Sequence, residues 1–121
     1  MGSEEEHMTL LRIYVAIFLI VLVAYTGIVI ANHGMGLVQI FFGDMAALTW
    51  PGQFNLDFMG FLLLSGLWVS WRHQYSPIGM LLTPLAVIGG MGFLCVYLLV
   101  ESFRVNGDLK ALLLGKARAA A

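Results

Sequence analysis

Three long apolar stretches constrain this chain more than any other feature of its sequence. They run over residues 10–31, 54–71 and 78–100, and their lengths fall within the ~17–25 residues that a helix needs to cross a bilayer. Unpaired backbone groups are too costly in lipid for anything but helices or closed barrels. The sequence therefore predicts an all-α membrane protein with three transmembrane helices.

The composition agrees with this class and excludes others. Apolar residues make up 60% of the 121 positions and charged residues 11%, whereas soluble domains have about 25% charged residues. A net charge of −1 gives no reason to expect a nucleic-acid partner. The single cysteine, Cys95, has no partner for a disulfide within the chain. We therefore expect the lipid bilayer to be the main partner.

The two ends of the chain are predicted to differ from the transmembrane domain, which we place at residues 8–104. Residues 1–7 read as the remnant of an expression tag, because a His-Met pair precedes a plausible natural start at Met8. The first apolar run is longer than the ~7–15-residue core of a signal peptide, so we expect it to be retained. Residues 105–121 form a basic tail, either a short helix resting on anionic lipid or a frayed, solubilising end.

The connection between the first two spans, residues 34–50, has a helical pattern of its own. Leu37, Phe41 and Leu48 recur at helical spacing, and Pro51 follows at the corner into the second span. The pattern predicts an amphipathic helix lying in the membrane interface. A re-entrant or fourth spanning segment is the alternative.

The third span contains a proline and several small residues. Pro84 is expected to kink it by removing a backbone hydrogen bond. Small residues four positions apart let helix backbones approach closely, within the chain or between protomers. Such pairs occur in all three spans: Gly27 with Ala31, Gly66 with Ser70, and Ala86 with Gly90.

Sidedness stays open at this level. Three crossings place Arg12 and Arg72 on one face of the membrane. The C-terminal tail then lies on the other face with the remaining basic residues, which are Arg104, Lys110, Lys116 and Arg118. The positive-inside rule favours a cytoplasmic C-terminus by count, but Arg12 and Arg72 stand tight against the span ends.

Alternating helices would also gather polar side chains at one face. The first span ends there, the second begins there and the third ends there. The candidates for ligand binding or proton coupling are Asn32, His33, Asp44, Asn55, Asp57, Glu101 and Arg104.

Asp57 is the central member of this set. It is either a charge that favours the positive end of its helix, worth about 0.3–1 kcal/mol, or an intramembrane acid paired with His33 or Arg104.

Little in the sequence indicates catalysis or a cofactor. His73 is predicted about 30 Å from His33 across the bilayer core, too far to hold haem or zinc with it. No spacing typical of a nucleophile and its base is present. We therefore expect no metal and no cofactor, and we favour a non-enzymatic role while leaving catalysis as an alternative.

The segments "NHGMGLVQIFFGDMAAL", "FNLDFMGFLLLSGLWV" and "PLAVIGGMGFLCVYLLVE" together resemble a group of small bacterial membrane proteins known as a domain of unknown function. The resemblance covers roughly residues 11–101, and Asp57 and Gly89 or Gly90 are the matching positions. It implies three helices in a bacterial inner membrane and supplies no activity.

Three functional hypotheses follow. The first is a small membrane subunit that packs with itself, as a homo-oligomer, or with a larger complex, and that contacts lipid, quinone or isoprenoid. The second is an oligomeric proton- or ion-coupled carrier in which Asp57 titrates. The third is a membrane enzyme acting on a lipid or isoprenoid at His33, Asp57 and Glu101.

Overall fold

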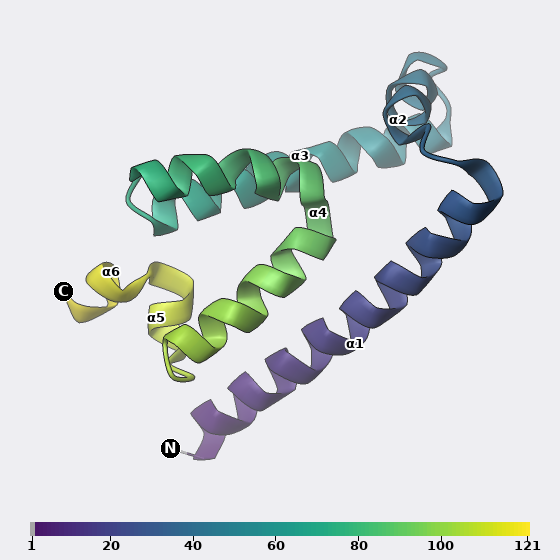
Figure 1. Ribbon diagram of the computed structural model, residues 1–121. Coiled ribbons are helices and arrows are strands. Elements are labelled where there is room, and N and C mark those ends of the chain that lie inside the picture. The colour runs from purple at the N-terminus through teal and green to yellow at the C-terminus, as the bar shows by residue number, and fades with distance from the viewer. Residues whose placement is uncertain (1) are drawn as a thin grey trace.

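The computed structural model describes residues 2–121, and these form six helices without a strand (Figure 1). The elements are α1 (Gly2–His33), α2 (Leu37–Ala46), α3 (Trp50–Arg72), α4 (Pro77–Arg104), α5 (Leu109–Leu114) and α6 (Lys116–Ala120). Three of them, α1, α3 and α4, are long and apolar enough to cross a membrane. The predicted all-α fold is confirmed at this level, and the chain is an integral membrane protein.

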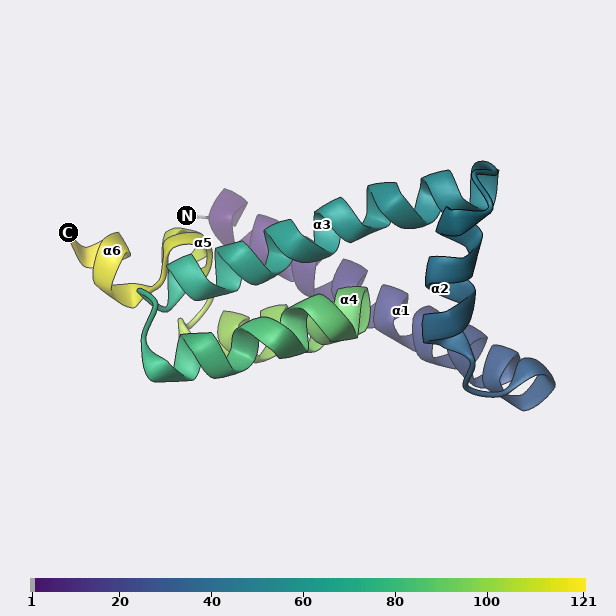
Figure 2. The ribbon, with the colours of Figure 1, turned by 90° about the horizontal axis from the view of Figure 1, so that it is seen from above.

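Beyond Arg12, helix α1 is apolar on every side, as expected for a helix surrounded by lipid. The first half of α1 packs chiefly against the end of α4. Its residues Met8 and Val15 are buried there, at 2% and 1% exposed. Every residue from 23 to 33 is exposed. In Figure 2 this outer half diverges from α3, and α2 bridges the gap between the two helices.

Helix α4 folds back on itself. A straight helix of 28 residues would place its ends about 40 Å apart at ~1.5 Å per residue. Yet Glu101, near the end of α4, forms an ion pair of 2.9 Å with Arg72, which precedes the start of α4. Two limbs, residues 77–89 and 91–104, therefore meet at a sharp bend (Figures 1 and 2). The prediction that the ends of the third span lie on opposite faces is wrong.

The bend lies at Gly90 and not at Pro84, where the sequence predicted a kink. Gly90 has φ 58° and ψ −139°, a backbone conformation that is essentially restricted to glycine. A Cβ at this position would lie 3.3 Å from Leu62 Cδ2 and 3.4 Å from Phe58 Cζ of α3. Pro84 lies inside the first limb, which stays helical around it.

Helix α2 lies across the start of α3. The side-chain amide of Asn55 donates to the carbonyl of Phe41 at 3.0 Å. Gly52 presses against the backbone of Asp44, leaving no room for a Cβ. The helix predicted within residues 34–50 is therefore present, and its position in the membrane interface stays a prediction.

The C-terminal tail is ordered and docked. Asp108 caps α5 by accepting from the backbone N–H groups of Lys110 and Ala111 at 3.1 and 3.4 Å. Ala111 and Leu112 then pack with Met8 in a buried cluster. The tail thus forms two short helices, α5 and α6, and its contact with anionic lipid stays a prediction.

Candidate functional site

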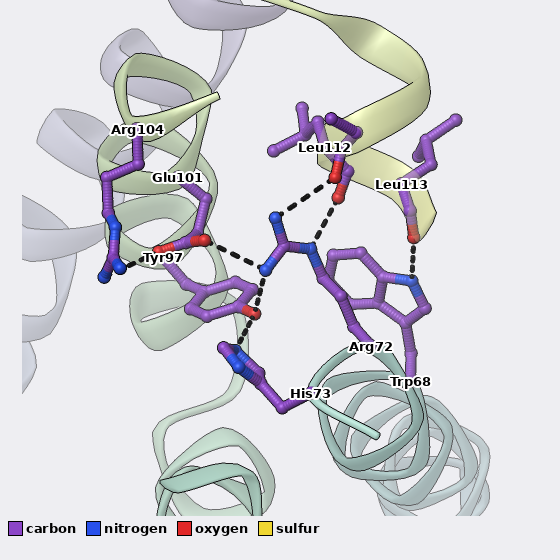
Figure 3. Close-up of polar contacts among 9 residues, drawn as sticks. Trp68, Arg72, His73, Tyr97, Glu101, Arg104, Leu112 and Leu113 are labelled. Atoms are coloured by element: carbon purple, nitrogen blue, oxygen red, sulfur yellow. Dashed lines mark hydrogen bonds and ion pairs between the residues drawn. The ribbon is translucent and has the colours of Figure 1, made fainter. Parts of the chain in front are cut away.

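A buried polar cluster joins α3, α4 and α5 at the end of the molecule where the chain terminates (Figure 3). We call it the Arg72 cluster; it comprises Arg72, His73, Tyr97 and Glu101. Arg72 is 4% exposed, and its Nη1 donates to Glu101 Oε1 at 2.9 Å and to the Tyr97 hydroxyl at 3.0 Å. A charge so buried is stable only when it is paired and hydrogen-bonded, and both conditions are met here.

Arg72 also holds the end of α5. Its Nε donates to the carbonyl of Leu112 at 2.6 Å and its Nη2 to that of Ala111 at 3.3 Å. Carbonyls in the last turn of a helix attract cations, and that of Ala111 also accepts from the backbone N–H of Gly115 at 2.8 Å. Beside them, the indole N–H of Trp68 donates to the carbonyl of Leu113 at 3.0 Å (Figure 3). The end of α3 thus fixes the tail helix in place.

Two further arginines do the same for other helix ends. Arg118 donates to the carbonyl of Trp71 at the end of α3, and its guanidinium lies 3.9 Å from the centre of the Trp71 ring. Arg12 donates to Ser102, to the hydroxyl at 3.0 Å and to the carbonyl at 2.9 Å. Each arginine places its positive charge at the negative end of a helix dipole.

His73 completes the cluster from the α3–α4 connection. Its Nε2 lies 2.6 Å from the Tyr97 hydroxyl. Burial lowers the pKa of His73, and the positive charges of Arg72 and Arg104 add to this effect while Glu101 opposes it. Since the Tyr97 hydroxyl accepts from Arg72, it is free to donate its proton to a neutral His73 ring.

The fold-back of α4 separates the predicted site residues into two groups. Glu101 lies in the Arg72 cluster, and Arg104 pairs with Glu101 at 3.5 Å. Asp57 is 15 residues before Arg72 on α3, about 22 Å away along the helix. The prediction that Glu101 and Arg104 join Asp57 and His33 is therefore wrong, because the bend at Gly90 returns the end of α4 to its starting side.

The remaining candidates lie at the α2 end of the molecule. Asn55 holds α2, as described above, and the Asp44 backbone packs on α3. Asn32, His33 and Asp57 have exposed side chains. The ion pairs among residues 2–121 all involve Glu101, so Asp57 is paired with neither His33 nor Arg104. Whether these residues bind a ligand stays a prediction.

All six basic residues of the chain lie at the end opposite α2. Four of them are placed by contacts already given: Arg12 on Ser102, Arg72 and Arg104 on Glu101, and Arg118 on Trp71. Lys110 belongs to α5, which Arg72 binds, and Lys116 follows Gly115, which packs against the Arg72 backbone. We call this end the basic end. Residues 13–71 and 73–103 contain no lysine or arginine.

An apolar groove of about 460 Å³ lies between α1, α3 and the second limb of α4. Two of its lining side chains carry a polar group, and the indole N–H of Trp68 is already bonded to Leu113, which leaves the hydroxyl of Ser65. Among the buried side-chain oxygen and nitrogen atoms of residues 2–121, the Ser65 oxygen is the one without a hydrogen-bond partner. The groove is lined by Phe18, Phe58, Phe61, Leu62, Leu64, Ser65, Trp68, Gly90, Met91 and Leu94.

Sequence reasoning missed the Arg72 cluster. The available signal was the pair of opposite charges at the span ends, Arg72 and Glu101, together with the glycine-rich run around Gly90. In the part of the chain that the structure describes, no three His, Cys, Asp or Glu side chains are grouped to hold a metal ion. No known protein family, curated protein or solved structure matches the chain.

Proposed function

We propose that the chain is a small non-enzymatic subunit of a bacterial inner membrane, which packs with itself or with a larger membrane complex and contacts lipid. The observation that carries this proposal is the exposed outer half of α1. Residues 23–33 are apolar with few exceptions, and all of them are exposed. So extended a surface requires lipid or a second protein around it.

Small residues on this half of α1 favour a protein partner over lipid alone. A Cβ at Gly27 would meet no atom within 4 Å, so the backbone there is open to a close approach. Ala31 stands four residues further on, on the same face of the helix. Close approach of a second helix at such a pair is a common mode of association in membranes.

The basic end supports an orientation for this subunit. The positive-inside rule assigns the face rich in lysine and arginine to the cytoplasm. All six such residues stand at one end, and α2 with its flanking loops has none. We therefore assign the two termini and the α3–α4 connection to the cytoplasmic face, and α2 to the periplasmic interface.

Native mass spectrometry of the protein in nanodiscs tests the proposal. We expect a defined oligomer, or a co-purified membrane protein, with lipid retained. A monomer released from the nanodisc with no lipid and no other protein bound would contradict the proposal. Gly27→Leu blocks the open face of α1 and is expected to reduce the oligomer, whereas Leu67→Ala on α3 is the control at an exposed position with no small-residue pair.

An oligomeric proton- or ion-coupled carrier is the second candidate, because Asp57 is exposed and forms no ion pair. Three apolar helices enclose too little volume for a path through one copy. Proton flux into liposomes that carry the protein, with Asp57→Asn as the variant, decides between the two. Flux that Asp57→Asn abolishes would favour the carrier, and absence of flux favours the subunit.

A further inference from the structure

We propose that the apolar groove binds one acyl chain of an anionic phospholipid, whose ester carbonyl accepts a hydrogen bond from Ser65 and whose headgroup lies at the basic end. This inference rests on the proposed function, since it names the lipid that the subunit contacts and the place where it is held.

The groove exists because α1 and α3 pack on different sides of a bent α4. The second limb of α4 leaves α3 at Gly90 and runs toward α1, so the two long helices are held apart above it. The resulting volume of about 460 Å³ is within the ~300–1,000 Å³ of ordinary ligand sites. A space of this size between membrane helices is filled by something other than water, since its lining is apolar.

The groove opens sideways, toward the bilayer. Phe61 and Leu64 line it, yet they are 67% and 61% exposed. An occupant therefore enters from the surrounding lipid and not from the aqueous face. Hydrocarbon chains are the component of the bilayer that meets this opening at the depth of α3.

Ser65 supplies the reason to expect a polar atom on the occupant. A buried hydroxyl without a hydrogen bond is costly, and Ser65 makes none with the chain. It precedes Arg72 by seven residues, which places it about 10 Å deeper than the basic end. In a phospholipid the ester carbonyls lie just inside the phosphate, and the chains continue inward. From Ser65 to Phe58 the groove offers about 10 Å more of apolar wall.

Charge selects the headgroup. Six basic residues stand at the basic end, and residues 8–121 place the carboxylates of Glu101 and Asp108 there. The predicted tag remnant adds Glu4, which accepts from the backbone N–H of Leu109, with Glu5 and Glu6 beside it. Glu101 is already paired with Arg72, and Asp108 caps α5. The side chains of Lys110 and Lys116 are exposed and form no ion pair within residues 2–121, so they are free to meet a phosphate. An anionic lipid is thus preferred to a zwitterionic lipid and to an uncharged quinone.

Competition between lipids tests the site. The full chain is placed in mixed micelles with equal amounts of phosphatidylglycerol, phosphatidylcholine and a ubiquinone, and bound species are read by native mass spectrometry. One retained phosphatidylglycerol per chain is expected, about fivefold or more in excess of phosphatidylcholine, since each cation near the surface contributes roughly that factor. Lys110→Gln with Lys116→Gln should bring the ratio toward one.

A groove-filling pair locates the site. Ser65→Phe occupies the groove and should abolish retention, whereas Leu67→Phe, on the same helix but outside the lining, should leave it intact. In case Ser65→Phe fails to fold, a second readout uses Trp68, which lines the groove. In a Trp50→Phe, Trp71→Phe background, phosphatidylglycerol with brominated acyl chains should quench Trp68 more than brominated phosphatidylcholine does.

Several results would overturn the inference. These are equal retention of both phospholipids, preferred retention of ubiquinone, a dimer that fills the groove with no lipid, and equal quenching by both brominated lipids. An oligomer without bound phosphatidylglycerol would refute the proposed lipid site but not the proposed function. A monomer with neither lipid nor protein bound would refute both the lipid site and the proposed function.

Discussion

Replacing Glu101 by leucine should destabilise the fold more than any other single change at a charged residue. Glu101 is 10% exposed and supplies the carboxylate that neutralises Arg72, which is 4% exposed. Without it the guanidinium keeps its hydrogen bonds to Tyr97, Ala111 and Leu112 but has no counter-charge. Removing one partner of a buried ion pair costs about 3–5 kcal/mol. Glu101→Gln retains an acceptor for Arg72, so we expect a smaller loss of about 1.5–3 kcal/mol.

The double variant isolates the pair. Arg72→Met with Glu101→Leu removes both charges, so the unfolding free energy should recover relative to Glu101→Leu alone, although the carbonyl of Leu112 loses its Arg72 donor and that of Ala111 keeps only the backbone N–H of Gly115. The recovery measures the coupling between the two side chains.

Thermal unfolding in detergent, followed by tryptophan fluorescence, provides the assay, because Trp68 lies beside the cluster. At roughly 3–5 °C per kcal/mol for a chain of this length, Glu101→Leu should lower the melting temperature by about 10 °C or more. Asp57→Asn, an exposed carboxylate with no ion pair, is the control and should change it by less than about 2 °C. Equal melting temperatures for the two variants would refute the role assigned to the Arg72–Glu101 pair.

Two other predictions concern the bend and the histidine. Gly90→Ala should cost about 1–3 kcal/mol because alanine avoids the backbone conformation of this residue, whereas Gly60→Ala, in open helix, should be neutral or slightly stabilising; similar melting temperatures would contradict the bend. Because the folded-state pKa of His73 is lowered, the unfolded chain takes up a proton first. Stability should therefore fall as pH drops below about 6.5. In His73→Gln the melting temperature should depend less on pH over this window. If its pH dependence equalled that of the unchanged protein, titration of His73 would not be the cause.

The sequence predicts the helices well because their signals are local. Apolar length gives the three long helices, Pro51 and Pro77 stand in their first turns, and the periodicity of residues 34–50 gives α2. Proline and glycine mark the connections, and no contact between distant residues is needed to interpret them.

The bend in α4 could not be predicted in the same way. Pro84 is the stronger local signal for a break, yet its limb remains helical, as membrane helices often do around proline. Gly90 breaks the helix because it adopts a non-helical backbone conformation. There it lies close to Phe58 and Leu62 of α3, and that contact joins residues far apart in the sequence. This one bend reverses the direction of the chain. A prediction without the bend therefore places Glu101 and Arg104 at the wrong end of the molecule.

The return of α4 to its starting face is tested most directly by the accessibility of single cysteines. In a Cys95→Ala background, Gln74→Cys reports the α3–α4 connection, Lys110→Cys the tail, and Met35→Cys the α1–α2 loop; all three positions are exposed. A membrane-impermeant maleimide added to intact cells should label Met35→Cys alone, and inverted vesicles should label Gln74→Cys and Lys110→Cys. Labelling of Gln74→Cys and Lys110→Cys from opposite sides would mean that α4 crosses the membrane, and would contradict the fold-back.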